Sequence, residues 1–101
     1  MQVTLKMVEK MDHLLDEAEE LAKCATAHSD DTELKSVYLE LARCHYDGYE
    51  KLARIASTVT DRKARNVGGE KGQVMREMVD WHKDKYRKRA EDIKRKIEEA
   101  R

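Results

Sequence analysis

The residues best suited to chemistry in this sequence are two cysteines and two histidines. Cys24 and His28 are four positions apart, and Cys44 and His45 are adjacent. Thiolates and imidazoles in this proportion are the ligands of a structural zinc site. Consecutive residues of a helix point about 100° apart, so Cys44 and His45 cannot easily reach one ion. We therefore expect Cys44 to be a small core residue and His45 a core histidine with a hydrogen-bond partner.

A second candidate chemistry is that of di-iron helical bundles, which ordinarily use Glu-x-x-His motifs on two helices. The sequence contains no such motif. Glu17 borders the apolar face of its segment, where a carboxylate more often forms a salt bridge between helices. We expect no catalytic residue, no cofactor and no metal. A metal site, if one existed, would draw on Cys44, His45, Glu17 and His82.

The segment VGGEKGQ contains Gly68, Gly69 and Gly72 and superficially resembles a phosphate-binding loop. It lacks the glycine spacing of such loops and the Lys-Ser/Thr pair that follows them, and no strand precedes it. We interpret the segment as a hinge or a helix C-cap.

The spacing of apolar residues predicts three long helices, over about residues 3–28, 31–66 and 73–100. Asp30 is the expected N-cap of the second helix, and Glu33 completes a capping-box pattern. The connection through Ser29 and Asp30 is so short that the first two helices must form an antiparallel hairpin. The sequence thus predicts one all-α domain over residues 1–101, a helical hairpin with a third long helix.

The second helix is expected to be central, because its apolar residues form the longest regular row. The predicted inward row is Leu34, Tyr38, Leu41, His45, Gly48, Leu52, Ile55 and Val59, flanked by Val37, Ala42, Cys44, Tyr49 and Ala56. Gly48 has no Cβ, so we expect another helix to pack closely against it. The polar turns after Val59 should project into solvent or pack on another chain.

The outer helices have inward rows of the same kind. Those rows are Met7, Met11, Leu14, Ala18, Leu21, Ala25 and His28 in the first helix, and Met75, Met78, Val79, His82, Tyr86, Ala90, Ile93 and Ile97 in the third, with Trp81 beside them. Three helices of this length are too slender for a compact 101-residue monomer. We therefore expect a homodimer that forms a larger helical bundle.

Charge is divided unequally along a chain whose net charge is zero. Residues 1–50 contain five Lys and Arg against twelve Asp and Glu, a net of −7, and residues 51–101 contain sixteen against nine, a net of +7. The simplest interpretation is that an acidic first helix lies beside a basic third helix. A functional interpretation is a basic surface for a partner, whose candidate residues are Lys83, Lys85, Arg87, Lys88, Lys94 and Arg95.

The chain has no apolar run near the roughly 20 residues of a membrane helix, and its first residues lack the apolar block of a signal peptide. We expect a cytoplasmic protein with no membrane association. In that compartment Cys24 and Cys44 are expected to be free thiols.

Two stretches of the chain, AEELAKCATAHSDDTELKSVYLELARCHYDGYEKLARIA and VMREMVDWHKDKYRKRAEDIKRKIEEAR, carry a resemblance that covers about residues 14–101. The chain resembles small ferritin-like helical proteins encoded by bacteriophages and prophages of gut Firmicutes. Members of that group tend to have Glu at the position of Arg43, His at Gly48 and Ala53, and a Glu-His pair at His82-Lys83. The resemblance implies a helical hairpin plus third helix of phage origin, in the cytoplasm of the host, without the residues of a metal site.

The function expected from these observations is a non-catalytic helical interaction protein that binds a protein partner, as an inhibitor of host defence or a regulator. One alternative is a ferritin-like metal-binding protein. Another is a nucleic-acid-binding protein that uses the basic third helix. We expect nucleic acid to bind only weakly and without specificity, because the segment has no recognition motif.

Overall fold

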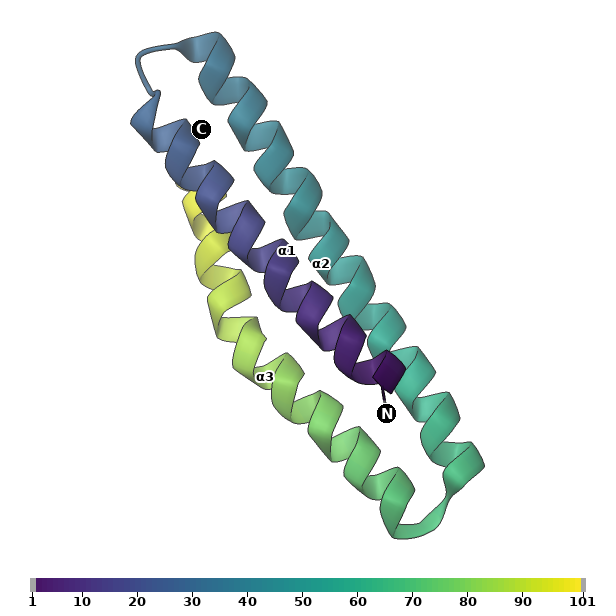
Figure 1. Cartoon of the computed structure of the whole chain (residues 1–101). Helices are drawn as coiled ribbons and strands as arrows, with labels where there is room; N and C mark the ends of the chain where they lie inside the picture. The colour runs from purple at the N-terminus through teal and green to yellow at the C-terminus, as the bar shows by residue number, and fades with distance from the viewer. Residues whose placement is uncertain (1, 101) are drawn as a thin grey trace.

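The computed structural model describes residues 2–100 and contains three helices, α1 (Gln2–Ala27), α2 (Thr32–Val67) and α3 (Gly69–Glu99). They lie side by side along one axis, with α2 antiparallel to both neighbours (Figure 1). The molecule measures 57 × 18 × 15 Å, and its Cα radius of gyration is 16.3 Å, against about 13 Å for a compact chain of this length. The predicted all-α fold is confirmed, and its shape is a rod.

Both connections between the helices are short. Asp31 is the N-cap of α2, and its carboxylate accepts a hydrogen bond from the Leu34 N–H at 3.0 Å; the sequence placed this cap one residue too early, at Asp30. Gly68 alone joins α2 to α3, with a φ of 69° that favours glycine. Its N–H donates to the Ala64 carbonyl at 2.8 Å. The predicted C-cap is confirmed, but α3 begins at Gly69 and not at residue 73.

The buried face of α2 is the predicted row displaced by one residue. The residues that pack into the core are Leu39, Ala42, Tyr46, Tyr49, Leu52, Ala53 and Ala56, and Thr60 is also buried. The predictions for Leu52 in the inward row and for Ala42, Tyr49 and Ala56 beside it are confirmed. A step of one residue turns a helix by about 100°, so Val37, Leu41 and Ile55 are 49%, 43% and 50% exposed. The prediction that these three residues face the core was wrong. The two rows have the same period, and the buried row fits better because its alanines let two helices approach while its tyrosines fill the space between them.

The inward faces of α1 and α3 were predicted more accurately. Their buried residues are Val8, Met11, Leu15, Ala18, Ala22 and Ala25 in α1, and Gly72, Met75, Val79, Ala90, Ile93 and Ile97 in α3. His28 is exposed, and Trp81 projects into solvent rather than beside the core. Met78, His82 and Tyr86 are half-buried at the edge of the core.

The helix α1 covers only part of the length of the other two. The ion pairs Asp12–Arg89 and Glu19–Lys96 each join residues 77 positions apart, so the first described residue of α1 is level with residue 79 of α3. Residues 60–67 of α2 and 69–78 of α3 therefore extend beyond α1 as a two-helix segment, which we call the tip (Figure 1). Thr60 and Ala64 are buried in this segment. The last turns of α2 thus pack on α3, contrary to the expectation that they project alone or contact another chain.

The two helices of the tip approach each other closely at Gly72. A Cβ on Gly72 would lie 2.4 Å from the carbonyl oxygen of Ala64, which is backbone and cannot move aside easily. A Cβ on Gly48 would meet only the Leu14 methyl groups, at 3.7 Å, an ordinary contact distance. Close packing between helices of this chain therefore requires a glycine at position 72, and not at position 48 as predicted.

We expect the substitution Gly72→Ala to lower the free energy of unfolding by about 1–3 kcal/mol, because the new methyl group forces α2 and α3 apart. Gly48→Ala is the matched control. It should leave that free energy unchanged or raise it by up to about 1 kcal/mol, because alanine favours helix more than glycine does. Equilibrium denaturation of the two variants measures the difference. Equal stability of the two variants would contradict the close approach at Gly72.

Candidate functional site

The cysteines and histidines that first suggested chemistry do not converge. Cys24 is half-buried on α1 and Cys44 is exposed on α2, and both thiols are free. The prediction that Cys44 is a core residue was wrong. His45 contacts the Leu41 carbonyl of its own helix through Nδ1 at 2.8 Å, so its predicted hydrogen-bond partner exists. His28 makes the same kind of contact with the Cys24 carbonyl, at 2.9 Å.

The remaining metal-ligand candidates, Glu17 and His82, lie on different helices. His82 is surrounded by aromatic rings, with its centroid 4.8 Å from that of Trp81 and 6.3 Å from that of Tyr86. Within residues 2–100, no three His, Cys, Asp or Glu side chains come close enough to hold one metal ion. The side chains present therefore do not fit the carboxylate and histidine centre of a ferritin-like protein.

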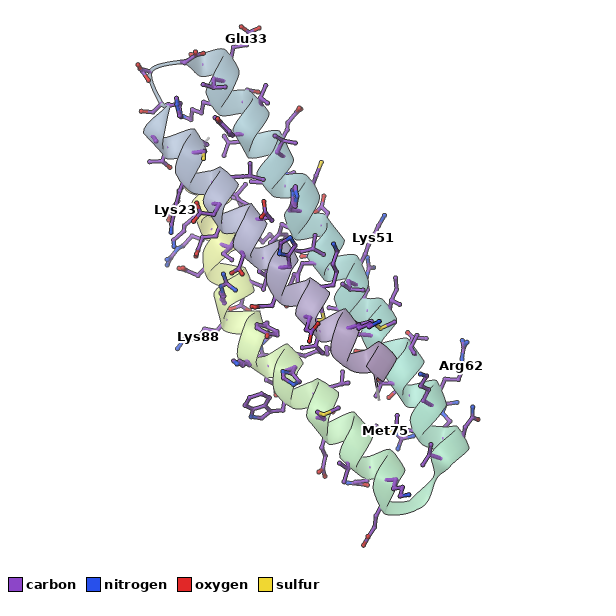
Figure 2. The ribbon with its side chains drawn as sticks, viewed as in Figure 1. Lys23, Glu33, Lys51, Arg62, Met75 and Lys88 are labelled. Carbon is purple, nitrogen blue, oxygen red and sulfur yellow. The ribbon has the colours of Figure 1, made fainter. Side chains whose placement is uncertain are left out.

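The basic residues predicted to bind a partner do not gather on one face of α3. Arg87 and Lys94 line grooves between α3 and α2, whereas Lys88 projects away from the other two helices (Figure 2). The Lys85 ammonium lies over the ring of Trp81, 5.3 Å from its centroid. The last two candidates are Lys83, which is half-buried, and Arg95, which pairs with Asp92 and Glu99 of its own helix.

The charge contact that joins α3 to α1 centres on Arg89, which the sequence did not single out. The Arg89 guanidinium bonds Asp12 at 3.1 Å and also Asp16, and it lies 3.8 Å from Glu19. Burial alone would lower the pKa of Arg89, but the hydrogen bond and charge of Asp16, with Glu19 and Asp12, raise it above its usual value. The expected pairing of an acidic first helix with a basic third helix is confirmed here. The sequence feature that could have identified Arg89 is its position beside the apolar row of α3.

Two tyrosines of α2 fill the middle of the rod. The rings of Tyr46 and Tyr49 are 5.9 Å apart, and both residues are buried. Burial, and then the neighbouring Glu50 carboxylate, raises the pKa of Tyr46 from 10.0 to about 12. The same two causes raise the pKa of Tyr49. Both phenols therefore favour their neutral form in the folded chain, where their rings are part of the core.

Exposed apolar side chains form two surfaces. Val37, Leu41 and Ile55 follow one side of α2, and with the exposed Cys44 we call them the α2 stripe. Val67, Val74 and Trp81, which are 54%, 57% and 60% exposed, lie at or beside the tip and form the second surface. Large apolar side chains exposed in clusters mark interaction sites more often than single ones do. Trp81 was predicted to lie beside the inward row of the third helix, and the residues of the stripe were predicted to lie in or beside that of the second, so both surfaces were missed.

A groove of about 580 Å³ lies on the open face of the tip. Its apolar lining is Val67, Val74 and Met75, and its polar residues include Lys63 and Lys71. Met75 belongs to the part of α3 that passes beside α2 beyond the start of α1 (Figure 2). The groove thus occupies the position that α1 would fill if it were about ten residues longer, which is ~15 Å of helix.

Comparison with protein-family models, with curated proteins and with solved structures finds no match to the chain. Among residues 2–100, no helix has both the length and the apolar character needed to cross a bilayer.

The Arg89 contacts make a specific prediction about stability. Arg89→Met should lower the free energy of unfolding by about 1–2 kcal/mol, because it removes charge-assisted hydrogen bonds between α3 and α1. Arg95→Met is the matched control and should lower it by only about 0.3–0.5 kcal/mol, because the partners of Arg95 lie on its own helix. Denaturation at low and high salt measures both effects, and salt should reduce the loss caused by Arg89→Met. Equal losses in the two variants would show that Arg89 does not join the helices.

Tyr46 makes a prediction about alkaline pH. In the unfolded chain the Tyr46 phenol loses its proton near pH 10.0, whereas in the folded chain it keeps the proton up to about pH 12. The folded state binds this proton more tightly than the unfolded state does, and the resulting stabilisation is complete below pH 10.0. It is lost as the pH rises through about 12. The free energy of unfolding should therefore fall across this window, and Tyr46→Phe should reduce the slope. Denaturation at a series of alkaline pH values checks this, and an unchanged slope in the variant would contradict it.

Proposed function

We propose that the protein is a non-catalytic helical interaction module that binds an amphipathic helix of a partner protein in the groove of the tip. One observation carries the proposal. The helices α2 and α3 extend about ten residues beyond α1, and the face left open is apolar. A helix in this groove would complete the three-helix packing that the rest of the rod already has.

The chemistry of the groove indicates what kind of helix it would recognise. Val67, Val74 and Met75 offer sites for apolar side chains at helical spacing, as in other complexes that bind a helix in a groove. Lys63 and Lys71 lie at its border, with one acidic neighbour, Glu70, so acidic residues beside the apolar face of the partner would be favoured. The preferred ligand is an acidic amphipathic helix of about three turns.

Trp81 extends this surface along α3. It lies one heptad after Val74, so both side chains occupy the same side of the helix. Tryptophan is among the residues that contribute most to protein interfaces. Lys85 covers one part of the indole ring at 5.3 Å and leaves the side chain largely exposed. A module of this kind acts by occupying a helix of its partner, which is how a small inhibitor or regulator works.

Nucleic-acid binding has less support than protein binding. The basic side chains of α3 are divided between grooves facing α2 and the opposite side of the helix. A phosphate backbone is bound best by basic groups that form one continuous surface.

Selection of peptides tests the proposal. A library of helical peptides is selected on the wild-type protein, and the affinities of the recovered peptides are measured by fluorescence anisotropy. We expect apolar residues at helical spacing with acidic neighbours. Val74→Asp should weaken binding by about 30-fold or more, because it places a charge in the apolar groove.

Val37→Asp is the matched control, because it puts the same charge at a similarly exposed valine of the α2 stripe. It should leave peptide affinity unchanged. If the selected peptides bind Val74→Asp as tightly as they bind the wild type, the tip groove is not the binding site.

A further inference from the structure

We propose that the α2 stripe binds the α2 stripe of a second copy of this chain, with the two α2 helices antiparallel. The stripe lies on another part of the rod from the tip groove, so this inference does not depend on the proposed function. It rests on four exposed residues of α2, Val37, Leu41, Cys44 and Ile55, and on the order of the charges beside them.

The apolar row is long and regular. Val37, Leu41 and Cys44 fall at the three- and four-residue spacing of one helix face, and Ile55 continues that face after Gly48 and Lys51. The four residues of the stripe are exposed, although the outer surface of this chain is otherwise highly charged. The edge of α1 borders the row, since Leu14 lies beside Gly48. A partner on this face would therefore contact mainly α2.

The charges beside the row change sign at its middle. The acidic residues Glu33, Glu40 and Asp47 precede Gly48, and the basic residues Lys51, Arg54 and Arg62 follow it. Glu40, Asp47 and Arg54 stand between the stripe and the grooves that α2 forms with α3. Glu33, Lys51 and Arg62 project from the side of α2 that faces away from α3 (Figure 2). None of the six takes part in an ion pair within the described residues. They remain available to a partner.

The order of apolar and charged residues along this side of α2 matches its own order read in the opposite direction. Leu41 and Ile55 are each seven positions from Gly48, so a two-fold axis beside Gly48 brings Leu41 of one copy to Ile55 of the other. Under the same operation Glu40, eight positions before Gly48, comes near Arg54, six positions after it, and Asp47, one position before, comes near Lys51, three positions after. Each pair is offset by two residues, about 3 Å along the helix, which long side chains can span. An isologous interface requires this kind of match, in which one surface binds its own copy.

A parallel arrangement of the two helices lacks the match. It would place the acidic half of one α2 at the same height as the acidic half of the other, and the two basic halves likewise, and like charges brought close together oppose association. An unrelated protein would need an independent surface with the same apolar row and the reverse order of charges. The observed pattern therefore favours a second copy in the antiparallel orientation.

Sedimentation equilibrium of the full chain tests whether the dimer exists. The wild type should have about twice the monomer mass of 11.8 kDa at micromolar concentration. Leu41→Glu and Ile55→Glu should each raise the dimer dissociation constant by about 30-fold or more. Val74→Asp is the control at the tip and should dimerise like the wild type. Circular dichroism identifies any variant that fails to fold.

A charge exchange tests the orientation. Glu40→Arg and Arg54→Glu should each raise the dimer dissociation constant by about tenfold. Each substitution replaces an ion pair by two like charges, and the two-fold symmetry makes this change occur twice in the interface. The double variant should recover the wild-type dissociation constant if the helices are antiparallel. In a parallel dimer the double variant would not recover the wild-type dissociation constant.

Cysteine cross-linking gives a second measure of orientation, on a background in which Cys24 and Cys44 are replaced by serine. Leu41→Cys and Ile55→Cys chains should form a disulfide when mixed, and neither should do so efficiently alone. A wild-type mass near 11.8 kDa throughout the micromolar range would overturn the proposal. Dissociation of the dimer by Val74→Asp would also overturn it, because that result would place the second copy at the tip. Efficient cross-linking of either single variant alone would contradict the antiparallel orientation.

Discussion

The packing of α2 against two helices at once is the contact on which the rest of the structure depends. Its buried row contains alanines at positions 42, 53, 56 and 64 and tyrosines at positions 46 and 49. The alanines let α1 and α3 approach the α2 backbone, and the tyrosines fill the space between the three axes. Because this row is narrow, the remaining apolar residues of α2 stay outside the core. The exposed stripe is thus a direct consequence of how the core is built.

The sequence predicted the fold class, the number of helices and most of their boundaries. Helical periodicity is a strong signal when it continues over seven or more turns, as in α2. It did not predict which of two parallel rows would be buried, because Leu41 and Ala42 belong to rows of identical period. Hydrophobicity favoured the leucine row, whereas steric fit favoured the alanine row. Only the positions of the neighbouring helices decide between these two, and a single sequence does not contain them.

The candidate surfaces were missed for the same reason. Trp81 and Ile55 were assigned to the core because large apolar residues are usually buried. The tip depends on the relative lengths and register of the helices, which are set by contacts between distant residues such as Arg89 and Asp16. The sequence did predict that acidic and basic helices would lie together. It did not show that their register would leave ten residues of α3 packed on α2 alone, without α1 beside them.

The single-residue connection at Gly68 has a consequence for folding kinetics. Ala64 and Gly72 are in close contact although only eight positions separate them, so the entropy lost in closing this loop is small. Contacts between α1 and α3 require the closure of a segment about 77 residues long. Local contacts form faster than distant ones. The connection between α1 and α2 is also short, so we expect both hairpins to form early and the contacts between α1 and α3 to form last, after the two helices of the tip are already in place.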